Sequence, residues 1–127
     1  MITFPKHINR ILVTGGSGFI GGNLVRRLLQ ETTTKVFNID KLGYASTLNI
    51  VNSNLDFRRY KLFNIDLTNV KDIRNTIDII DPDIVFHLAA ESHVDRSILG
   101  PRIFLESNVI GTFNLLEVLL SYWDLLP

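Results

Sequence analysis

The sequence predicts an α/β protein built on a parallel sheet. Short apolar runs alternate along the chain with longer segments in which apolar residues recur every three or four positions. Almost continuously apolar strands that alternate with helices are typical of a parallel sheet covered on both faces. A glycine-rich turn also follows the first run. With right-handed crossovers, the doubly wound arrangement gives a Rossmann-like sheet with strand order 3-2-1-4.

The first half of the chain contains two predicted strands and one predicted helix. Residues 10–14 form a short β-branched run ended by glycines, which indicates a buried strand. Apolar residues at three- and four-residue spacing predict an amphipathic helix over 19–30. Three threonines end this helix, and residues 35–40 form the second strand. Residues 43–54 are polar and rich in turn formers, so we expect a loop with room for one short helix.

The second half repeats the alternation. Residues 57–63 predict a third strand, and residues 69–80 predict a helix with one apolar face. Pro82 ends this helix because proline cannot continue the hydrogen-bond ladder. Residues 84–90 are the most apolar predicted strand, and a last helix is expected from about 104 to 123.

Length and composition restrict the class of protein. The 127 residues fit one domain, and 46% apolar with 20% charged residues is the composition of a globular protein. Thirteen basic residues balance thirteen acidic ones, which argues against nucleic acid as a partner because binding it requires phosphate neutralisation. The absence of cysteine excludes disulfides and thiolate chemistry, and we expect no metal site.

The sequence also predicts no membrane partner. No apolar stretch reaches the ~18 uninterrupted residues of a membrane-spanning helix. Lys6 and Arg10 precede an apolar run, as in a secretory signal, but five glycines interrupt that run. We therefore expect a cytoplasmic location.

The strongest local signal is the stretch 14–21, in which Gly15, Gly18 and Gly21 are spaced three apart between a strand and a helix. The first glycine permits the sharp turn, the second lets a pyrophosphate approach the backbone, and the third permits close helix packing. The amides and the positive end of the helix dipole then receive the anion. Glycine turns that merely join elements look similar, so the position of the motif is what predicts a dinucleotide site.

Two acidic residues follow predicted strands. Asp40 ends the second strand, nineteen residues after Gly21. A carboxylate there accepts bonds from ribose hydroxyls and repels the 2′-phosphate of NADP, which favours NAD, although Lys41 next to it softens the preference. The alternative is that Asp40 caps a turn. Asp66, after the third strand, either accepts from the adenine amino group or caps a turn.

Other polar residues near the sheet edge have competing interpretations. Ala89 and Ala90 leave room either for a cofactor or for a packed helix. His87 lies within a strand, which favours a hydrogen-bonded core histidine over a catalytic base. His93 lies in the polar loop 91–97, where a site role and solvent exposure are equally supported. A basic cluster is expected to form a solvated strand edge: Arg58, Arg59 and Lys61.

Four stretches together resemble the extended short-chain dehydrogenase/reductases, and most closely the N-terminal part of the dTDP-glucose 4,6-dehydratases: 14–21, 40–45, 88–98 and 108–112. The segment 89–97 is the most family-specific, and the chain can be matched to about residue 120. The resemblance implies that residues 1–127 are an NAD-binding Rossmann domain, whereas the nucleotide sugar dTDP-glucose binds to a C-terminal domain absent from this chain.

The resemblance implies cofactor contacts position by position. Ser92 would also contact the sugar substrate. Ser107 stands where the family commonly has a threonine beside the nicotinamide, and Gly43 replaces another common threonine, which leaves only a backbone contact. The implied cofactor-binding residues are Gly15, Gly18, Phe19, Ile20, Gly21, Asp40, Lys41, Leu42, Gly43, Asp66, Leu67, Leu88, Ala89, Ala90, Glu91, Ser92 and Ser107.

The sequence departs from the family at its catalytic residues. The family uses a Tyr-x-x-x-Lys pair, whose tyrosine takes the sugar hydroxyl proton, and a Thr-Asp-Glu acid/base group. The tyrosines of this chain are followed four positions on by Leu48, Asn64 and Leu126. We therefore expect the first third of such an enzyme, with a cofactor site, no catalytic residue and no activity by itself.

Three hypotheses for the function follow. The first is the N-terminal part of a dTDP-glucose 4,6-dehydratase, which oxidises C4, eliminates water across C5 and C6, and returns the hydride to C6. The second is a UDP-glucose 4-epimerase or a decarboxylase of the same superfamily, although 40–45 and 91–93 favour the dehydratase. The third is a non-catalytic dinucleotide-binding module or an inactive truncated product.

The last predicted helix has too many apolar residues for one buried stripe. Helices of this region pack against a second subunit in the family, so a homodimer is implied. We expect the chain to dimerise or aggregate through this helix. The alternative is that the helix packs fully onto the sheet, with residues 122–127 folded over it.

Overall fold

The computed structural model describes residues 1–43 and 56–127. Within them, four parallel strands form one sheet in the order β3-β2-β1-β4, which confirms the predicted fold class and strand order. The strands are β1 (Arg10–Thr14), β2 (Lys35–Asp40), β3 (Tyr60–Asn64) and β4 (Ile84–His87). Except for Gly43, the predicted loop 43–54 with its possible short helix lies outside the described residues.

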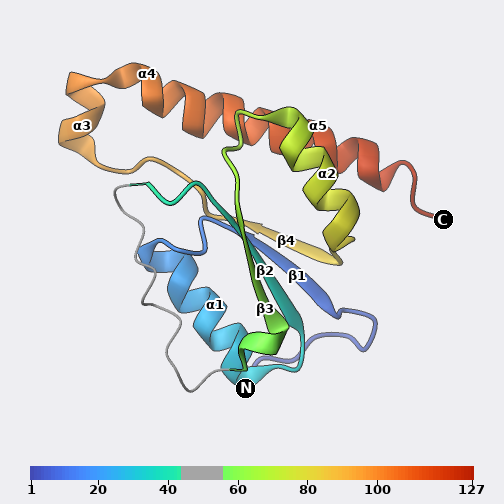
Figure 1. The fold of residues 1–127 in the computed structure, drawn as a ribbon. Coiled ribbons are helices and arrows are strands. Elements are labelled where there is room, and N and C mark those ends of the chain that lie inside the picture. Colours follow the sequence, from blue (N-terminus) through green and yellow to red (C-terminus); the bar gives the residue numbers. More distant parts are fainter. Residues whose placement is uncertain (44–55) are drawn as a thin grey trace.

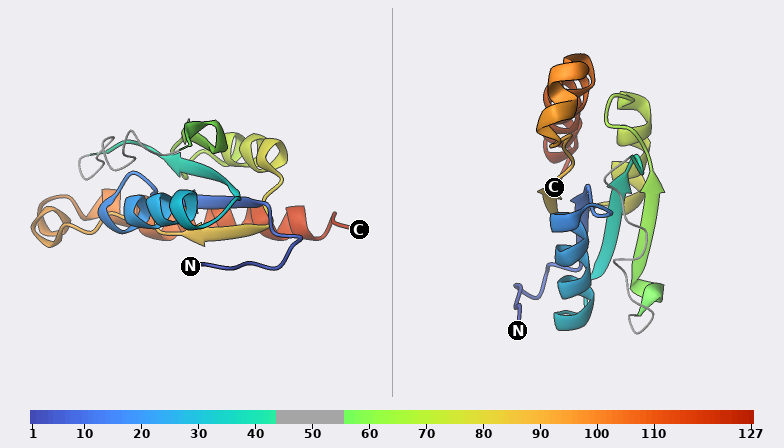
Figure 2. Two further views of the ribbon diagram at one scale, coloured as in Figure 1. Left: turned by 90° about the horizontal axis from the view of Figure 1, so that it is seen from below. Right: turned by 90° about the vertical axis from the view of Figure 1, so that its left-hand side faces the viewer.

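Helices cover both faces of the sheet (Figures 1 and 2). Helix α1 (Phe19–Glu31) lies on one face, and α2 (Val70–Ile80) and α5 (Gly111–Trp123) lie on the other. Side chains alternate between the faces along a strand. In β1, Ile11 and Val13 therefore join the core under α1, whereas Leu12 joins the core under α2 and α5.

Two strand predictions extend too far. Phe57–Arg59 form a 3-10 turn, η2, so β3 begins only at Tyr60. The fourth strand ends at His87 rather than at residue 90. The Leu88 amide still donates to the Thr14 carbonyl at 3.1 Å, but the Ala89 amide donates to the Thr14 hydroxyl at 3.2 Å instead of continuing the ladder.

The C-terminal helical region begins earlier than the sequence predicts. Helix α3 (Val94–Leu99) occupies most of the expected polar loop, and α4 (Pro101–Phe104) has proline at its first position, where the missing N–H costs nothing. A π-helical segment, η3 (Leu105–Ile110), joins α4 to α5. Such segments interrupt the regular helical register and occur frequently at functional sites.

One basic residue of the predicted solvated edge has a structural role instead. The Arg59 guanidinium donates to the carbonyls of Leu29, Thr32 and Thr34 at 2.7, 3.1 and 2.8 Å. These carbonyls lie at and beyond the end of α1, where backbone acceptors lack helical partners. The expectation was therefore wrong for Arg59, although Arg58 is exposed as predicted.

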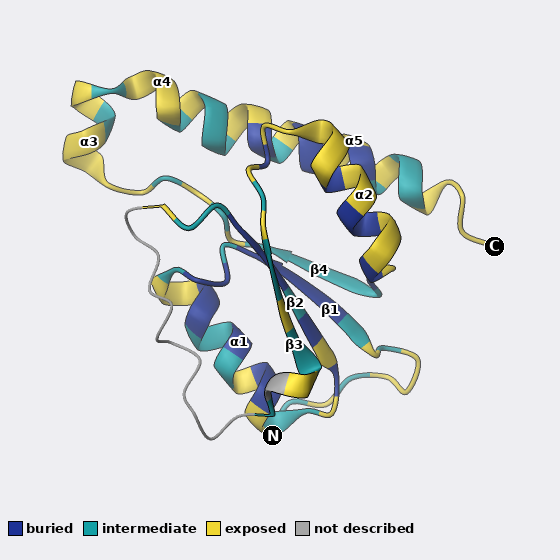
Figure 3. Ribbon diagram, viewed as in Figure 1, coloured by how far each residue is buried: buried dark blue, intermediate teal, exposed yellow. Residues whose placement is uncertain are grey.

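The C-terminal helix buries only one side (Figure 3). Leu115 and Val118 are buried against α2 and the sheet, whereas Leu116 and Leu120 are 61% and 57% exposed. Leu125 in the terminal segment is also exposed, so the alternative of a helix fully covered by the sheet and the tail is wrong. Other exposed apolar residues of this region are Ile103, Leu105, Val109, Ile110, Phe113 and Trp123.

In the described part of the chain, Pro101–Trp123 has the length and mean hydropathy, 1.4, of a membrane-spanning helix. Apolar helices that cover the sheet of a globular protein meet the same criteria, and the buried side of α5 makes such contacts. The absence of a membrane partner stays a prediction.

Candidate functional site

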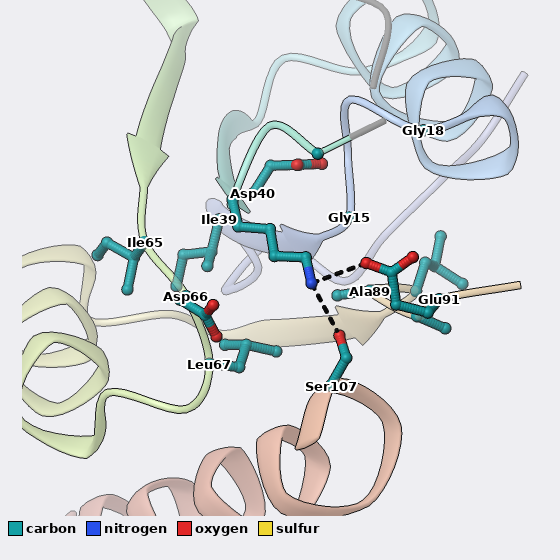
Figure 4. A pocket seen from close by; sticks show the side chains of 14 residues that line it. Gly15, Gly18, Ile39, Asp40, Ile65, Asp66, Leu67, Ala89, Glu91 and Ser107 are labelled. Atoms are coloured by element: carbon teal, nitrogen blue, oxygen red, sulfur yellow. Dashed lines mark hydrogen bonds and ion pairs between the residues drawn. The ribbon is translucent and has the colours of Figure 1, made fainter. Parts of the chain in front are cut away.

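A cavity partly open to solvent lies at the carboxyl ends of the strands (Figure 4). Ligands of open α/β sheets bind at this edge. All lining residues except Ile39 and Ile65 belong to the set implied by the resemblance. The lining residues from that set are Gly15, Gly18, Asp40, Lys41, Gly43, Asp66, Leu67, Leu88, Ala89, Ala90, Glu91 and Ser107.

Five residues of the implied set do not line the cavity. Phe19 and Ile20 are exposed on the first turn of α1, and Gly21 is buried behind them. Leu42 adopts a positive φ of 54° beside the cavity, and Ser92 is exposed in the segment after β4. The structure therefore brings together most of the set, and the binding roles of its members stay predictions.

The glycine turn requires glycine at its first and last positions. Gly15 has a φ of +70°, and a Cβ there would lie 2.7 Å from the backbone of Ala89. A Cβ on Gly21 would lie 2.1 Å from the Gly15 carbonyl oxygen. Real Cβ atoms do not approach backbone this closely, so both glycines let the turn, α1 and the exit of β4 pack together.

Gly18 begins α1 at the cavity. Within the described residues no side chain caps this helix end, and its first turn carries no acidic residue. The first amides of a helix lack intrahelical partners and lie at the positive end of its dipole. This arrangement suits a phosphate group in the cavity.

Asp40 caps both turns that flank the cavity. Its buried carboxylate accepts from the amide of Ser17 at 3.0 Å and from that of Leu42 at 2.7 Å. The turn-capping interpretation is therefore confirmed. An ionised carboxylate has about four acceptor positions, so capping is compatible with the predicted ribose contact.

Asn38 fixes the glycine turn, a role that the sequence reading missed. Its fully buried side chain accepts from the amide of Gly16 at 2.8 Å and donates to Ser17 Oγ at 3.0 Å and to the Tyr60 hydroxyl at 3.1 Å. A buried amide must find partners, because leaving it unsatisfied costs free energy. The sequence did contain a signal for this role, because an asparagine lies within a strand that we expected to be buried on both faces.

Lys41 also lines the cavity. Its ammonium group pairs with Glu91 Oε1 at 2.8 Å and donates to Ser107 Oγ at 3.4 Å. Asn108, the residue after Ser107, accepts from the amide of Glu91 at 2.8 Å and donates to its carbonyl at 2.9 Å. The π-helical segment η3 thus holds one wall through Asn108, which the sequence reading also left without a role.

Asp66 and Leu67 form the opposite wall. Asp66 Oδ1 accepts from the amide and the hydroxyl of Thr68, both at 2.9 Å, so this residue caps a turn. The Leu67 carbonyl accepts from the buried Asn114 side chain at 2.9 Å. Helix α5 therefore supports this wall, and the adenine contact of Asp66 stays a prediction.

The two candidate histidines differ. His87 is half-buried between the Thr14 and Thr112 side chains, at 2.6 and 2.8 Å, as expected of a hydrogen-bonded core residue. Burial lowers its pKa below the usual value. His93 is exposed, precedes α3 and does not line the cavity. Among the described residues, no group of three or more potential metal ligands occurs.

Comparison with curated proteins finds relatives of greater length. The dTDP-glucose 4,6-dehydratase of Salmonella typhimurium is 46% identical over 117 residues, which are 92% of this chain and 32% of that protein. The dTDP-glucose 4,6-dehydratase of Haemophilus influenzae is 47% identical over 116 residues, 91% of this chain and 34% of that protein. The chain thus spans about a third of the length of the curated relatives it matches.

Solved structures share the fold. The dTDP-glucose 4,6-dehydratase of Streptomyces venezuelae, crystallised with NAD bound, superposes with a TM-score of 0.80 at 36% identity, covering 88% of this chain and 36% of that one. The UDP-glucose 4-epimerase of Thermus thermophilus in complex with NAD gives 0.77 at 32% identity, covering 89% and 34%.

A family model settles the assignment. The model described as GDP-mannose 4,6 dehydratase matches residues 12–125, which include the last three residues of β1, the other three strands and every residue that lines the cavity. The chain therefore belongs to the GDP-mannose 4,6 dehydratase family.

Proposed function

We propose that the chain forms the NAD-binding part of a dTDP-glucose 4,6-dehydratase. The observation that carries the proposal is the cavity at the carboxyl edge of the sheet, whose lining matches most of the cofactor set implied by the resemblance. Relatives named as this enzyme, at 43–47% identity, and NAD-bound structures of the same fold support it.

The residues present fit NAD. The start of α1 at Gly18 has no side-chain cap and lies at the cavity, so its amides would hold the pyrophosphate. Asp40 would accept from the adenosine ribose, and Asp66 with Leu67 would flank the adenine. Ser107 and 88–92 would lie toward the nicotinamide. When bound, NAD would supply the hydride acceptor at C4 and the donor at C6 of the sugar.

A 4-epimerase is the second candidate, because epimerases share the fold at comparable TM-scores. Sequence identity separates the two. Among the solved structures, the epimerases match at 26–32% identity, whereas the dTDP-glucose 4,6-dehydratases match at 35–39%. The dehydratase is therefore the better supported function.

The variant Gly18→Asp tests the proposed anion site by a change that the fold should tolerate. A carboxylate at this helix-capping position is favourable for α1, and the added Cβ would meet the Gly15 carbonyl at 3.3 Å, which calls for only a small adjustment. We expect little change in the free energy of unfolding, but at least tenfold weaker NAD binding by calorimetry because the carboxylate repels the pyrophosphate (~1.4 kcal/mol per tenfold change). Unchanged NAD affinity in the folded variant would contradict the proposed anion site.

The chain alone should not convert dTDP-glucose. The 127 residues contain no Tyr-x-x-x-Lys pair, and a positioned acid or base typically contributes ~10²–10⁴-fold to one proton transfer. We expect no dehydration product when the purified chain is incubated with NAD and dTDP-glucose and the mixture is analysed by mass spectrometry. Measurable turnover would show that another residue of this chain performs the proton transfer.

We further propose that the chain forms homodimers through the exposed side of its C-terminal helix. Its apolar residues exceed what a monomer surface normally leaves in water. Light scattering over a dilution series should show self-association that the double substitution Leu116→Lys and Leu120→Lys abolishes. Ile79→Lys on α2, which changes an equally exposed apolar residue, should leave it intact. A monomer at every concentration would refute the proposal.

The remaining proposals concern location and partners. We propose a cytoplasmic location, and the neutral net charge supports a protein that does not bind nucleic acid. The buried side of α5, packed against α2, supports a helix that covers a sheet rather than one that crosses a membrane.

A further inference from the structure

The Thr14 hydroxyl connects β1 to the wall of the cavity. Thr14 is fully buried at the carboxyl end of β1. Its Oγ1 accepts from the amides of Leu88 and Ala89, both at 3.2 Å, and lies 2.6 Å from His87 Nδ1. Leu88 and Ala89 line the cavity, and Ala89 is the residue that Gly15 approaches most closely.

The bonds to this hydroxyl determine the tautomer of His87. A hydroxyl has two acceptor positions and one proton. The two amides occupy the acceptor positions, so the Thr14 proton must be donated to His87 Nδ1. Nδ1 is therefore unprotonated, and Nε2 carries the proton of the neutral ring and donates it to Thr112 Oγ1 at 2.8 Å.

We propose that His87 is a positioning residue of the NAD site: as the Nε2-protonated tautomer it orients the Thr14 hydroxyl, which fixes the backbone of Leu88 and Ala89 at the cavity wall. The identity of the ligand in this inference rests on the proposed function. This series of hydrogen bonds ends at Thr112, on the first turn of α5. That turn comes directly after η3, which holds Glu91 through Asn108. Both ends of 88–91 are thus tied to the same helical region.

Protonation of His87 conflicts with this arrangement. An imidazolium presents an N–H at Nδ1, which meets a hydroxyl whose acceptor positions are already used. The hydroxyl must then release an amide. Leu88 has a second acceptor, the Thr14 carbonyl at 3.1 Å, so its bond to the hydroxyl is the one released at least cost. The cavity wall then loses one of its two bonds to the Thr14 side chain.

Among the described residues, no charged side chain bonds to the His87 ring. The groups that contact its ring from β1 and α5 are hydroxyls. On the elements packed against it, Arg10 of β1 pairs with Asp81 and Asp83, and Glu117 of α5 is exposed. In the cavity Lys41 pairs with Glu91. Burial is the cause of the lowered pKa of His87, so affinity should fall as pH drops below about 6.5, the ordinary histidine value.

The test combines nitrogen NMR of the imidazole with NAD calorimetry on the full chain. His87→Gln retains an acceptor and a donor but does not titrate, whereas His87→Leu retains neither. We expect the Nε2-protonated tautomer in the wild type, and NAD affinity about tenfold weaker in the leucine variant. The glutamine variant should keep most of the affinity and lose its pH dependence. Thr112→Val, with Thr112→Ser as the conservative rescue, gives the same comparison if His87→Leu does not fold.

The outcomes separate the two claims. A proton on Nδ1, equal affinities of the glutamine and leucine variants, or a wild-type affinity independent of pH would overturn the positioning role while leaving the NAD site intact. Failure of the wild-type chain to bind NAD would overturn the proposed function and, with it, the role of His87 in NAD binding. The tautomer seen by NMR would then test only the hydrogen bonds of His87 to Thr14 and Thr112.

Discussion

Replacing Gly21 with alanine is expected to destabilise the chain by at least about 3 kcal/mol, a large part of the ~5–15 kcal/mol that holds a typical domain together. The new methyl group would lie 2.1 Å from the Gly15 carbonyl oxygen and 2.8 Å from Gly16 Cα. Both are backbone atoms of a turn that is itself packed against Ala89, so no flexible side chain can move aside. Urea unfolding measures the loss, and failure to fold meets the same expectation.

Gly100→Ala is the matched control. A Cβ at Gly100 would meet its nearest neighbour, the Arg96 carbonyl oxygen, at an ordinary 3.8 Å, and the φ of −145° suits any residue. We expect a change within about 0.5 kcal/mol. Similar stabilities for the two alanine variants would contradict the packing of α1 against the glycine turn.

Replacing Asp40 with alanine is expected to remove most of the preference for NAD over NADP. We expect the wild-type chain to bind NAD at least tenfold more tightly, a difference of about 1.4 kcal/mol, because the buried carboxylate repels the 2′-phosphate. The variant should bind NAD less well and NADP no worse. Calorimetric titration of both cofactors gives the ratio.

Asp66→Ala controls for a non-specific loss of cofactor affinity caused by removing a carboxylate from the cavity lining. Asp66 is also a carboxylate of the lining, but it caps the turn at Thr68 on the opposite wall. Its replacement should weaken both cofactors alike and leave their ratio unchanged. Equal NAD and NADP affinities in the wild type, or the same ratio in the Asp40 variant, would contradict the role of Asp40.

Local patterns predicted most of the fold. The periodicity of 19–30 and the glycine spacing at 15, 18 and 21 act within a few residues, so they are readable without the rest of the chain. The strand order followed because crossover handedness restricts parallel sheets to few arrangements.

The hydrogen bonds between residues far apart in the chain could not be predicted from the sequence. Asn38 bonds to Gly16, Asn108 bonds to Glu91, and Arg59 bonds to the end of α1, and each pair is 17 to 30 residues apart. A polar side chain shows that it needs a partner, but only the packed structure shows which one. The early end of β4 has the same origin, because the amide of Ala89 donates to the distant Thr14 side chain.

The most direct test of the dinucleotide site is the change in backbone amide NMR shifts when NAD is added to the 127-residue chain. We expect saturable shifts for the amides at the start of α1, for those of Asp66 and Leu67, and for those of 88–91, which all surround one cavity. Amides of 32–34, at the far end of α1, should not move. Saturable shifts at 32–34 with none around the cavity, or no shifts at all, would contradict the account.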